Sequence, residues 1–241
     1  MLGIIIQLAI TWLLVWFFEK GNLSVLGFRP TKQRLRDFII FFIVTATFCA
    51  LGFFVQMHFG RQQWKMNPEL TLKLFLSGFW WNLKSVLFEE LIFRGALLYI
   101  LIKKIGAPMA IIISSVAFGI YHWFSFGVIG DPMQMIIAFL TTGTMGLLLA
   151  YGYSKTFSLY IPIAIHLGWN LTRIFIFSQG PIGNGVFITK DQEPFRTDSY
   201  IVFILVTFVP MLLMFLTDYL LIRRYAPHVN GTKNLIAEKM Q

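Results

Sequence analysis

Residues 70–102 read LTLKLFLSGFWWNLKSVLFEELIFRGALLYILI, an apolar run in which two acids, Glu89 and Glu90, precede Arg94 by one turn. A charged side chain at the centre of a bilayer costs about 2.5–3.5 kcal/mol on insertion scales, so such residues usually have buried partners and a function. Later apolar segments carry three more polar side chains: His122, His166 and Asn170. Glutamate, histidine and asparagine together form a set that can activate water, here inside a membrane segment.

The composition is that of a membrane protein. Of the 241 residues, 57% are hydrophobic and 13% are charged, whereas a soluble domain carries about 25% charged residues. The net charge of +9 comes from basic residues scattered over short loops. Such residues set topology and meet anionic headgroups, so we expect the lipid bilayer as a partner and no nucleic acid.

Seven apolar runs are long enough to cross a bilayer as helices. We therefore predict an all-α fold, a polytopic transmembrane helical bundle of about seven spans. The third run is longer than one span needs, and a break near Asn82–Lys84 would give eight. The runs are 2–18, 38–59, 70–102, 108–126, 132–152, 157–178 and 200–222.

Basic residues predict the orientation, because they concentrate on the inner side of a membrane. Placing the N-terminus outside and the C-terminus inside puts twelve basic residues inside and five outside. The first run is expected to be a retained anchor. The inside residues are Lys20, Arg29, Lys32, Arg34, Arg36, Lys103, Lys104, Lys155, Arg223, Arg224, Lys233 and Lys239, and the outside ones are Arg61, Lys65, Lys73, Lys190 and Arg196.

The chain is expected to have three regions. Residues 1–69 hold the N-terminal spans and a basic surface segment at 21–37, interpreted as a topology anchor in preference to a specific lipid site. Residues 70–178 form a catalytic helical core. Residues 179–241 contain an outer loop, the last span and a polar tail, and the loop is interpreted as a plain connection in preference to a lid. The one cysteine, Cys49, excludes an intrachain disulfide.

The polar groups are predicted to share one depth. A helix rises ~1.5 Å per residue, so Glu89, His122 and Asn170 lie ~20 Å, and His166 ~13 Å, along their segments from the same membrane edge. Separate segments can therefore bring their polar groups to one layer, where they satisfy one another.

Each residue also has a structural interpretation. Glu90 and Arg94, four residues apart on a helix, can form an ion pair that only holds helices together. Glu89 points about 100° away and needs its own partner, so it is the candidate general base. A histidine alone is more often bonded to a carbonyl in a core, and only the shared depth favours a joint site. Asn170 could donate to an oxyanion.

Metal binding stays open at this point. Two histidines and a glutamate are a hydrolytic zinc set, which here would be Glu89, His122 and His166. The His-Glu-x-x-His signature is absent, because the histidines lie on different segments. The same residues suit a water activated by glutamate and histidine without metal.

Other functions are compatible with parts of the pattern. A Ser–His hydrolase is possible, because serines lie near His122, but no Gly-x-Ser-x-Gly elbow occurs. A proton-coupled transporter would use buried acids, but no internal repeat supports it. A non-catalytic regulatory or bacteriocin-immunity protein would use the polar groups only to hold helices or a partner peptide. The serines are Ser114, Ser115 and Ser125.

Three motifs in order resemble a known family. Glu-Glu-x-x-x-Arg, Phe-x-x-x-His and His-x-x-x-Asn follow one another on successive apolar segments, over roughly residues 80–175, and are similar to those of the CPBP family. These are the CAAX-processing and bacteriocin-processing (Abi) proteases of membranes, which include the type II prenyl-protein endopeptidase. Leu26-Gly27-Phe28-Arg29 is also similar. The motif residues are Glu89, Glu90, Arg94, Phe118, His122, His166 and Asn170.

The resemblance implies an intramembrane endopeptidase of a peptide or protein substrate associated with the membrane. Carried over by position, Glu89 activates water, His122 helps to hold it, and His166 and Asn170 stabilise the oxyanion. Glu90 and Arg94 support the site. No cofactor is favoured, with zinc as the alternative. An integral protein of a prokaryotic cell membrane is expected, and a prenylated substrate does not follow.

Overall fold

The computed structural model describes residues 2–60, 62–189, 197 and 199–225, and this part of the chain is almost entirely helical. The predicted all-α class is confirmed, apart from one short two-stranded ribbon. The helices are α1 (Leu2–Glu19), α2 (Lys32–Gly60), α3 (Leu72–Phe93), α4 (Ala96–Ile105), α5 (Ala107–Ser125), α6 (Pro132–Thr156), α7 (Tyr160–Asn170) and α8 (Tyr200–Arg223). Shorter elements are the 3-10 turn η1 (Leu23–Leu26), the π-helical turn η2 (Leu171–Ile176) and the strands β1 (Trp64–Met66) and β2 (Phe187–Thr189).

Five of these helices, α1, α2, α5, α6 and α8, are long and apolar enough to cross a membrane. Their outer faces are apolar and exposed, as at Phe54, Leu140 and Leu212, where 58%, 58% and 59% of the residue surface is accessible. Exposed apolar surface over several helices fits a polytopic protein whose surroundings are lipid. The count of seven spans and the orientation stay predictions.

The third apolar run consists of two helices that meet at Gly95. Arg94 ends α3 with φ −118° and ψ 3°, and a Cβ at Gly95 would collide with the carbonyl oxygen of Leu91. The alternative of a break near Asn82–Lys84 does not hold, because both residues lie inside α3. Asn82 does not break the helix, since its side-chain amide donates to the carbonyl of Gly78 in the turn before it (2.9 Å).

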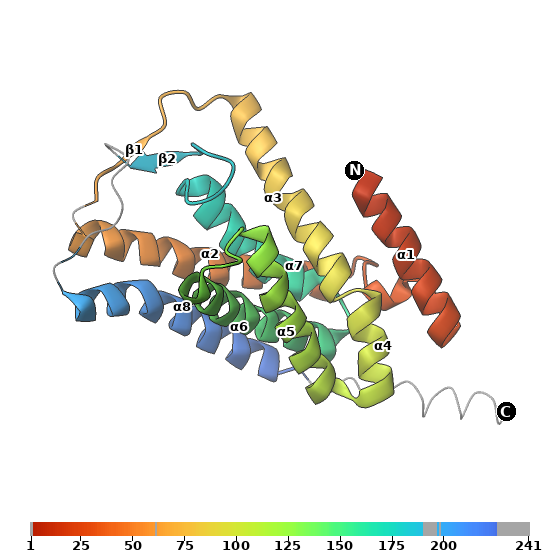
Figure 1. The fold of residues 1–241 in the computed structure, drawn as a ribbon. Helices are drawn as coiled ribbons and strands as arrows, with labels where there is room; N and C mark the ends of the chain where they lie inside the picture. The colour runs from red at the N-terminus through yellow and green to blue at the C-terminus, as the bar shows by residue number, and fades with distance from the viewer. Residues whose placement is uncertain (1, 61, 190–196, 198, 226–241) are drawn as a thin grey trace.

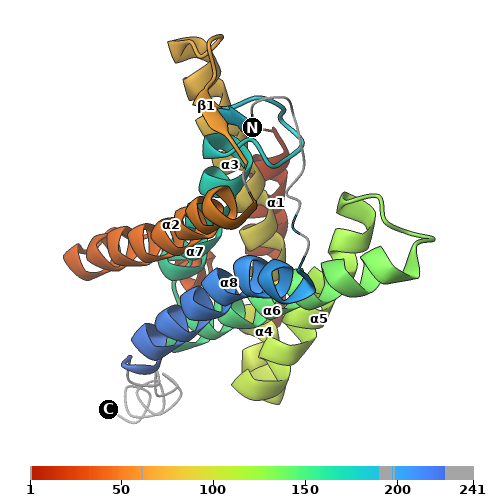
Figure 2. The ribbon, with the colours of Figure 1, turned by 90° about the vertical axis from the view of Figure 1, so that its left-hand side faces the viewer.

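Helix α7 lies at the centre of the bundle, and Ile161–Gly168 are buried without interruption. It packs on α2, α3 and α6, while α2 also runs along α8 (Figure 1). Gly168 permits the approach to α2, because a Cβ there would lie 2.8 Å from the carbonyl oxygen of Phe42. Figure 2 shows the hairpin of α5 and α6 extending on the side of the molecule opposite to α2.

The segment between α1 and α2 is fastened to the bundle at the turn between α6 and α7. Leu26 is fully buried, its carbonyl oxygen accepts from the backbone N–H of Leu159 (3.0 Å), and Tyr153 donates its hydroxyl to the carbonyl of Val25 (2.7 Å). Gly27 adopts φ +64°, and a Cβ there would collide with Phe157 and its neighbour. Part of the predicted surface segment at 21–37 is therefore buried.

The ribbon joins two loops that are far apart in the sequence. β1 and β2 are antiparallel, with Trp64 opposite Thr189, and the Asn67 side chain donates to the carbonyl of Gly185 (2.9 Å). Strand β1 lies on the segment that leads from α2 to α3 (Figure 1). Strand β2 falls within the segment predicted as a plain loop, 179–199, of which 190–196 and 198 lie outside the described residues.

Candidate active site

The acid pair lies in the last turn of α3, and both carboxylates are buried. Glu90 is fully buried and Glu89 is 8% exposed. Neighbouring residues on a helix point about 100° apart, so the two carboxylates meet different partners. Helix α3 ends three residues after Glu90, which places both acids beside the break at Gly95.

Glu89 faces two histidines from two other helices. Its Oε2 lies 3.8 Å from Nε2 of His122 on α5 and 3.7 Å from Nε2 of His166 on α7. The two histidines are 6% and 4% exposed. The prediction that α3, α5 and α7 bring these three side chains to one place therefore agrees with the geometry, since Glu89 is within reach of a bridging water to each histidine.

Nδ1 of each histidine ring has a hydrogen-bond partner, and this bond fixes the direction in which Nε2 points. His122 Nδ1 donates to the backbone carbonyl of Phe118 (2.8 Å), because a carbonyl oxygen can only accept. His166 Nδ1 lies 2.7 Å from Oε1 of Glu90. Each Nε2 consequently points toward Glu89.

Glu90 joins two partners. Its Oε1 accepts from Nη1 of Arg94 at 3.0 Å, with both side chains fully buried, and the same oxygen meets His166. The ion pair along α3 was predicted from the spacing, but the bond to His166 was not. No local pattern could reveal it, because the two residues are 76 positions apart.

Phe118 contributes to the site twice. Its ring lies 4.5 Å from the His122 ring, one helical turn along α5. The sequence did not indicate that the Arg94 guanidinium stacks on the same ring, with its central carbon 4.1 Å from the ring centroid. Nε and Nη2 of Arg94 are buried without a hydrogen-bond partner among the described residues, so the aromatic face is a main compensation for this charge.

Asn170 is a candidate catalytic residue that does not hydrogen-bond to the other three. It is the last residue of α7, half-buried, and forms no hydrogen bond with Glu89, His122 or His166, all of which lie in the described part. The helix changes to the π form directly after it, a feature that often marks functional sites.

Two serines near the site are engaged elsewhere. Ser114 donates to the carbonyl of Phe93 (2.9 Å) and Ser115 to that of Ile111 (2.6 Å). A nucleophilic serine would need its hydroxyl directed to a histidine. These bonds weaken the Ser–His alternative.

A buried polar pair that the sequence reading missed lies on the far side of α7. Asp218 on α8 accepts from the hydroxyl of Thr45 on α2 (2.9 Å), and both are fully buried. Asp218, the single acid in the apolar run at 200–222, was the feature of the sequence that could have indicated this pair.

The geometry for zinc is incomplete. Donors at ~2.0–2.2 Å from a tetrahedral zinc lie roughly 3.3–3.6 Å apart, slightly less than the distances from Glu89 to the two rings. In the residues that the structure describes, no group of three or more histidines, cysteines or acids has the arrangement of a metal site. The hydrogen bonds of Nδ1 in both rings do resemble those that orient metal-binding histidines.

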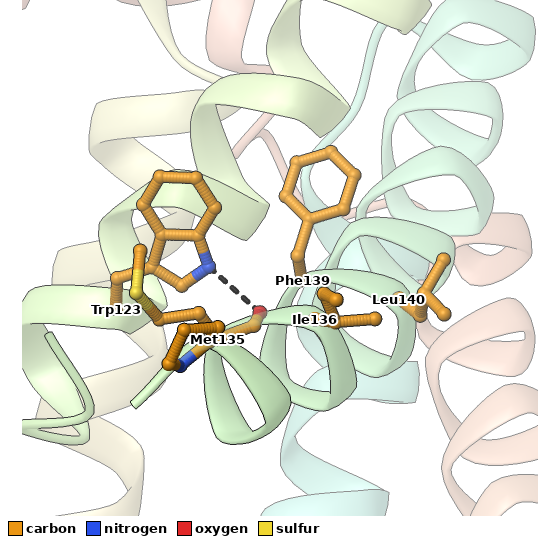
Figure 3. A pocket seen from close by; sticks show the side chains of 6 residues that line it. Trp123, Met135, Ile136, Phe139 and Leu140 are labelled. Carbon is orange, nitrogen blue, oxygen red and sulfur yellow. Dashed lines mark hydrogen bonds between the residues drawn. The ribbon is translucent and has the colours of Figure 1, made fainter. Parts of the chain in front are cut away.

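An apolar groove of about 370 Å³ lies between α5 and the start of α6. Figure 3 shows the Trp123 indole over this groove, with its N–H donating to the carbonyl of Met135 (2.8 Å). Its lining side chains are apolar, so it offers contact area without reactive groups. They belong to Trp123, Pro132, Met135, Ile136, Phe139 and Leu140.

The helices and the buried acid–histidine cluster define a helical membrane protein with a candidate hydrolytic site. Residues 71–172 match the family model of the type II CAAX prenyl endopeptidase, Rce1-like. The matched segment contains every candidate site residue. This match supports the resemblance of the chain to the CPBP family of membrane proteases. No curated protein and no solved structure gave a match.

Proposed function

We propose that this chain is an intramembrane endopeptidase in which Glu89 activates the attacking water. The observation that carries this proposal is the approach of Glu89 Oε2 to Nε2 of both His122 and His166, at 3.8 and 3.7 Å, in a buried site. A carboxylate beside two imidazoles is a common arrangement for general acid–base catalysis.

Hydrogen bonding suggests different roles for the two rings. The Nδ1–H group of His122 donates a hydrogen bond to a backbone carbonyl. In the neutral ring Nε2 therefore has a lone pair and can accept a hydrogen bond from the water. Glu89 would accept the other hydrogen. The water is then held by two acceptors, with its oxygen lone pair free to attack the peptide carbonyl.

His166 is proposed to carry protons on both nitrogens. Nδ1–H would donate to Glu90, and Nε2–H to the oxyanion that forms on the substrate carbonyl. The buried charges then cancel, because Glu89 and Glu90 are negative while Arg94 and His166 are positive. A balanced cluster avoids the large cost of an unpaired charge in an apolar interior.

The reaction follows from these positions. Glu89 takes a proton as the water oxygen bonds to the carbonyl carbon, and the tetrahedral oxyanion is held by His166 and, on substrate binding, by Asn170. Glu89 then returns the proton to the leaving nitrogen as the C–N bond breaks. Glu90 and Arg94 keep the His166 ring in place.

Peptidomics of membranes that contain the wild-type chain or Glu89→Gln tests this function. We expect cleavage products to vanish in Glu89→Gln and to fall strongly in His166→Ala. Glu69→Gln is the matched control, because it removes the same charge at an exposed position. Unchanged processing in Glu89→Gln would show that the acid pair only holds helices, as in a regulatory or immunity protein.

The metal question is part of the same proposal, and we favour a site without a catalytic cofactor. Elemental analysis of the purified protein should find less than stoichiometric zinc, and cleavage should survive chelators. Stoichiometric zinc, with activity lost to a chelator and restored by zinc, would contradict this and leave the peptidase assignment standing. The proposed setting is a prokaryotic cell membrane.

A further inference from the structure

A cleft of about 410 Å³ with polar and apolar lining residues lies between the first three turns of α2 and the end of α8, and it shares no residue with the acid–histidine cluster. Both helices run side by side in the bundle (Figure 1). Five of its lining residues, at positions 33, 36, 37, 40 and 41, form one face of α2. The lining residues are Gln33, Arg36, Asp37, Ile40, Phe41, Leu221, Arg224 and Tyr225.

Two guanidinium groups are available in this cleft. Arg36 is exposed; its Nη2 lies 3.5 Å from the Asp37 carboxylate, and its guanidinium also contacts the Tyr225 hydroxyl. Arg224 is exposed, and its guanidinium has no hydrogen bond or ion pair among the described residues. Neighbouring Arg34 differs, because its guanidinium donates to the carbonyl of Arg29 (2.8 Å).

The wall of the cleft contains a buried acid, Asp37, beside a tyrosine. Asp37 has only 6% of its side chain exposed, and it lies beside the Tyr225 hydroxyl. Burial, and then the Asp37 carboxylate, raise the pKa of Tyr225, so the phenol keeps its proton and stays a donor. With two arginines and one aspartate the lining charge is +2 − 1 = +1.

The net charge of the lining matches a ligand that carries one negative charge. A phosphodiester carries one negative charge, whereas a phosphate monoester carries up to two. Planar guanidinium groups pair with phosphate oxygens through two parallel hydrogen bonds. The lining also contains the apolar side chains of Ile40, Phe41 and Leu221. The adjacent surface of α2 exposes Ile39 and Ile43 to the extent of 56% and 55%.

We infer that this cleft binds the phosphodiester headgroup of a membrane phospholipid, with Arg36 and Arg224 on the phosphate and the acyl chains along α2 and α8. Basic pockets between transmembrane helices are known lipid sites. The site does not depend on the proposed peptidase chemistry, since none of its residues belongs to that cluster.

Native mass spectrometry of the detergent-purified chain, titrated with phosphatidylglycerol, tests this site. We expect one lipid to bind and the double variant Arg36→Gln/Arg224→Gln to lose affinity by roughly tenfold or more. The control is Arg34→Gln/Arg223→Gln, which removes two charges from the same helix ends at positions that do not line the cleft, and should change affinity by less than about twofold.

Three results would overturn the inference. Equal losses in both double variants would show unspecific attraction of charge. Displacement of the lipid by inorganic phosphate at equal concentration would show a free-anion site. Unchanged lipid binding in Arg224→Gln, a single variant that removes no internal bond, would show that the cleft is not the binding site.

Discussion

At the residue scale, Phe118 connects the two halves of the candidate site. Its carbonyl holds His122 and its ring face covers the Arg94 guanidinium. Arg94 in turn holds Glu90, which holds His166. Phe118 thus influences the position of both imidazole rings, and its replacement should disturb each of them.

Phe118→Leu is expected to lower peptide cleavage and the melting temperature, because a desolvated cation–π contact contributes about 2 kcal/mol. Phe118→Tyr keeps the ring and should retain most activity. Cleavage rates and thermal unfolding in detergent check both variants. Equal behaviour of Leu and Tyr variants would show that the aromatic face does not matter.

Glu90→Gln is predicted to be as damaging as a change at Glu89, but through stability. Removing one partner of a buried ion pair costs about 3–5 kcal/mol, and here both Arg94 and His166 lose theirs. A fall in the unfolding midpoint in Glu90→Gln, against a nearly unchanged midpoint in Glu89→Gln, would separate the two roles. Equal midpoints would contradict the division.

At the scale of elements, the distance between α2 and α7 is set by a glycine. A Cβ at Gly168 would lie 2.8 Å from Phe42 O and 3.3 Å from Thr45 Cβ, so Gly168→Ala should displace α7 and with it His166. We expect lower stability and slower cleavage. Gly143→Ala is the control, because its nearest atom would be 3.6 Å away, and alanine in a helix interior gains roughly 0.5–1 kcal/mol. Equal stability of the two variants would contradict the close approach.

The elements also show where sequence patterns were sufficient. The length of the apolar runs was sufficient to predict the helices, and the polar positions within these runs were sufficient to predict that Glu89, His122 and His166 meet. The break at Gly95 could not be predicted in this way, because it depends on a clash with Leu91 O that only the folded backbone reveals. The bond between Glu90 and His166 also required tertiary contacts.

At the scale of the whole molecule, orientation can be tested on one helix. Asp131 caps the start of α6 and Lys155 lies in its last turn, so they mark opposite ends. With Cys49 replaced by Ala, the chain has no native thiol. In sealed cells, a membrane-impermeant maleimide should label Asp131→Cys and spare Lys155→Cys. The reverse pattern would invert the predicted orientation.

The placement of both acids at the end of α3, far in sequence from their partners, has a consequence for biogenesis. Glu90 leaves the ribosome 76 residues before His166, a delay of about 4–15 s at 5–20 residues per second. During that interval Glu90 has Arg94 as a partner but Glu89 still lacks the His166 ring, and lipid disfavours a carboxylate without its partner. We expect nascent chains that end before residue 166 to stay crosslinked to the insertion machinery through α3, and longer ones to release it. Translation speed past this stretch would then govern the yield of folded protein.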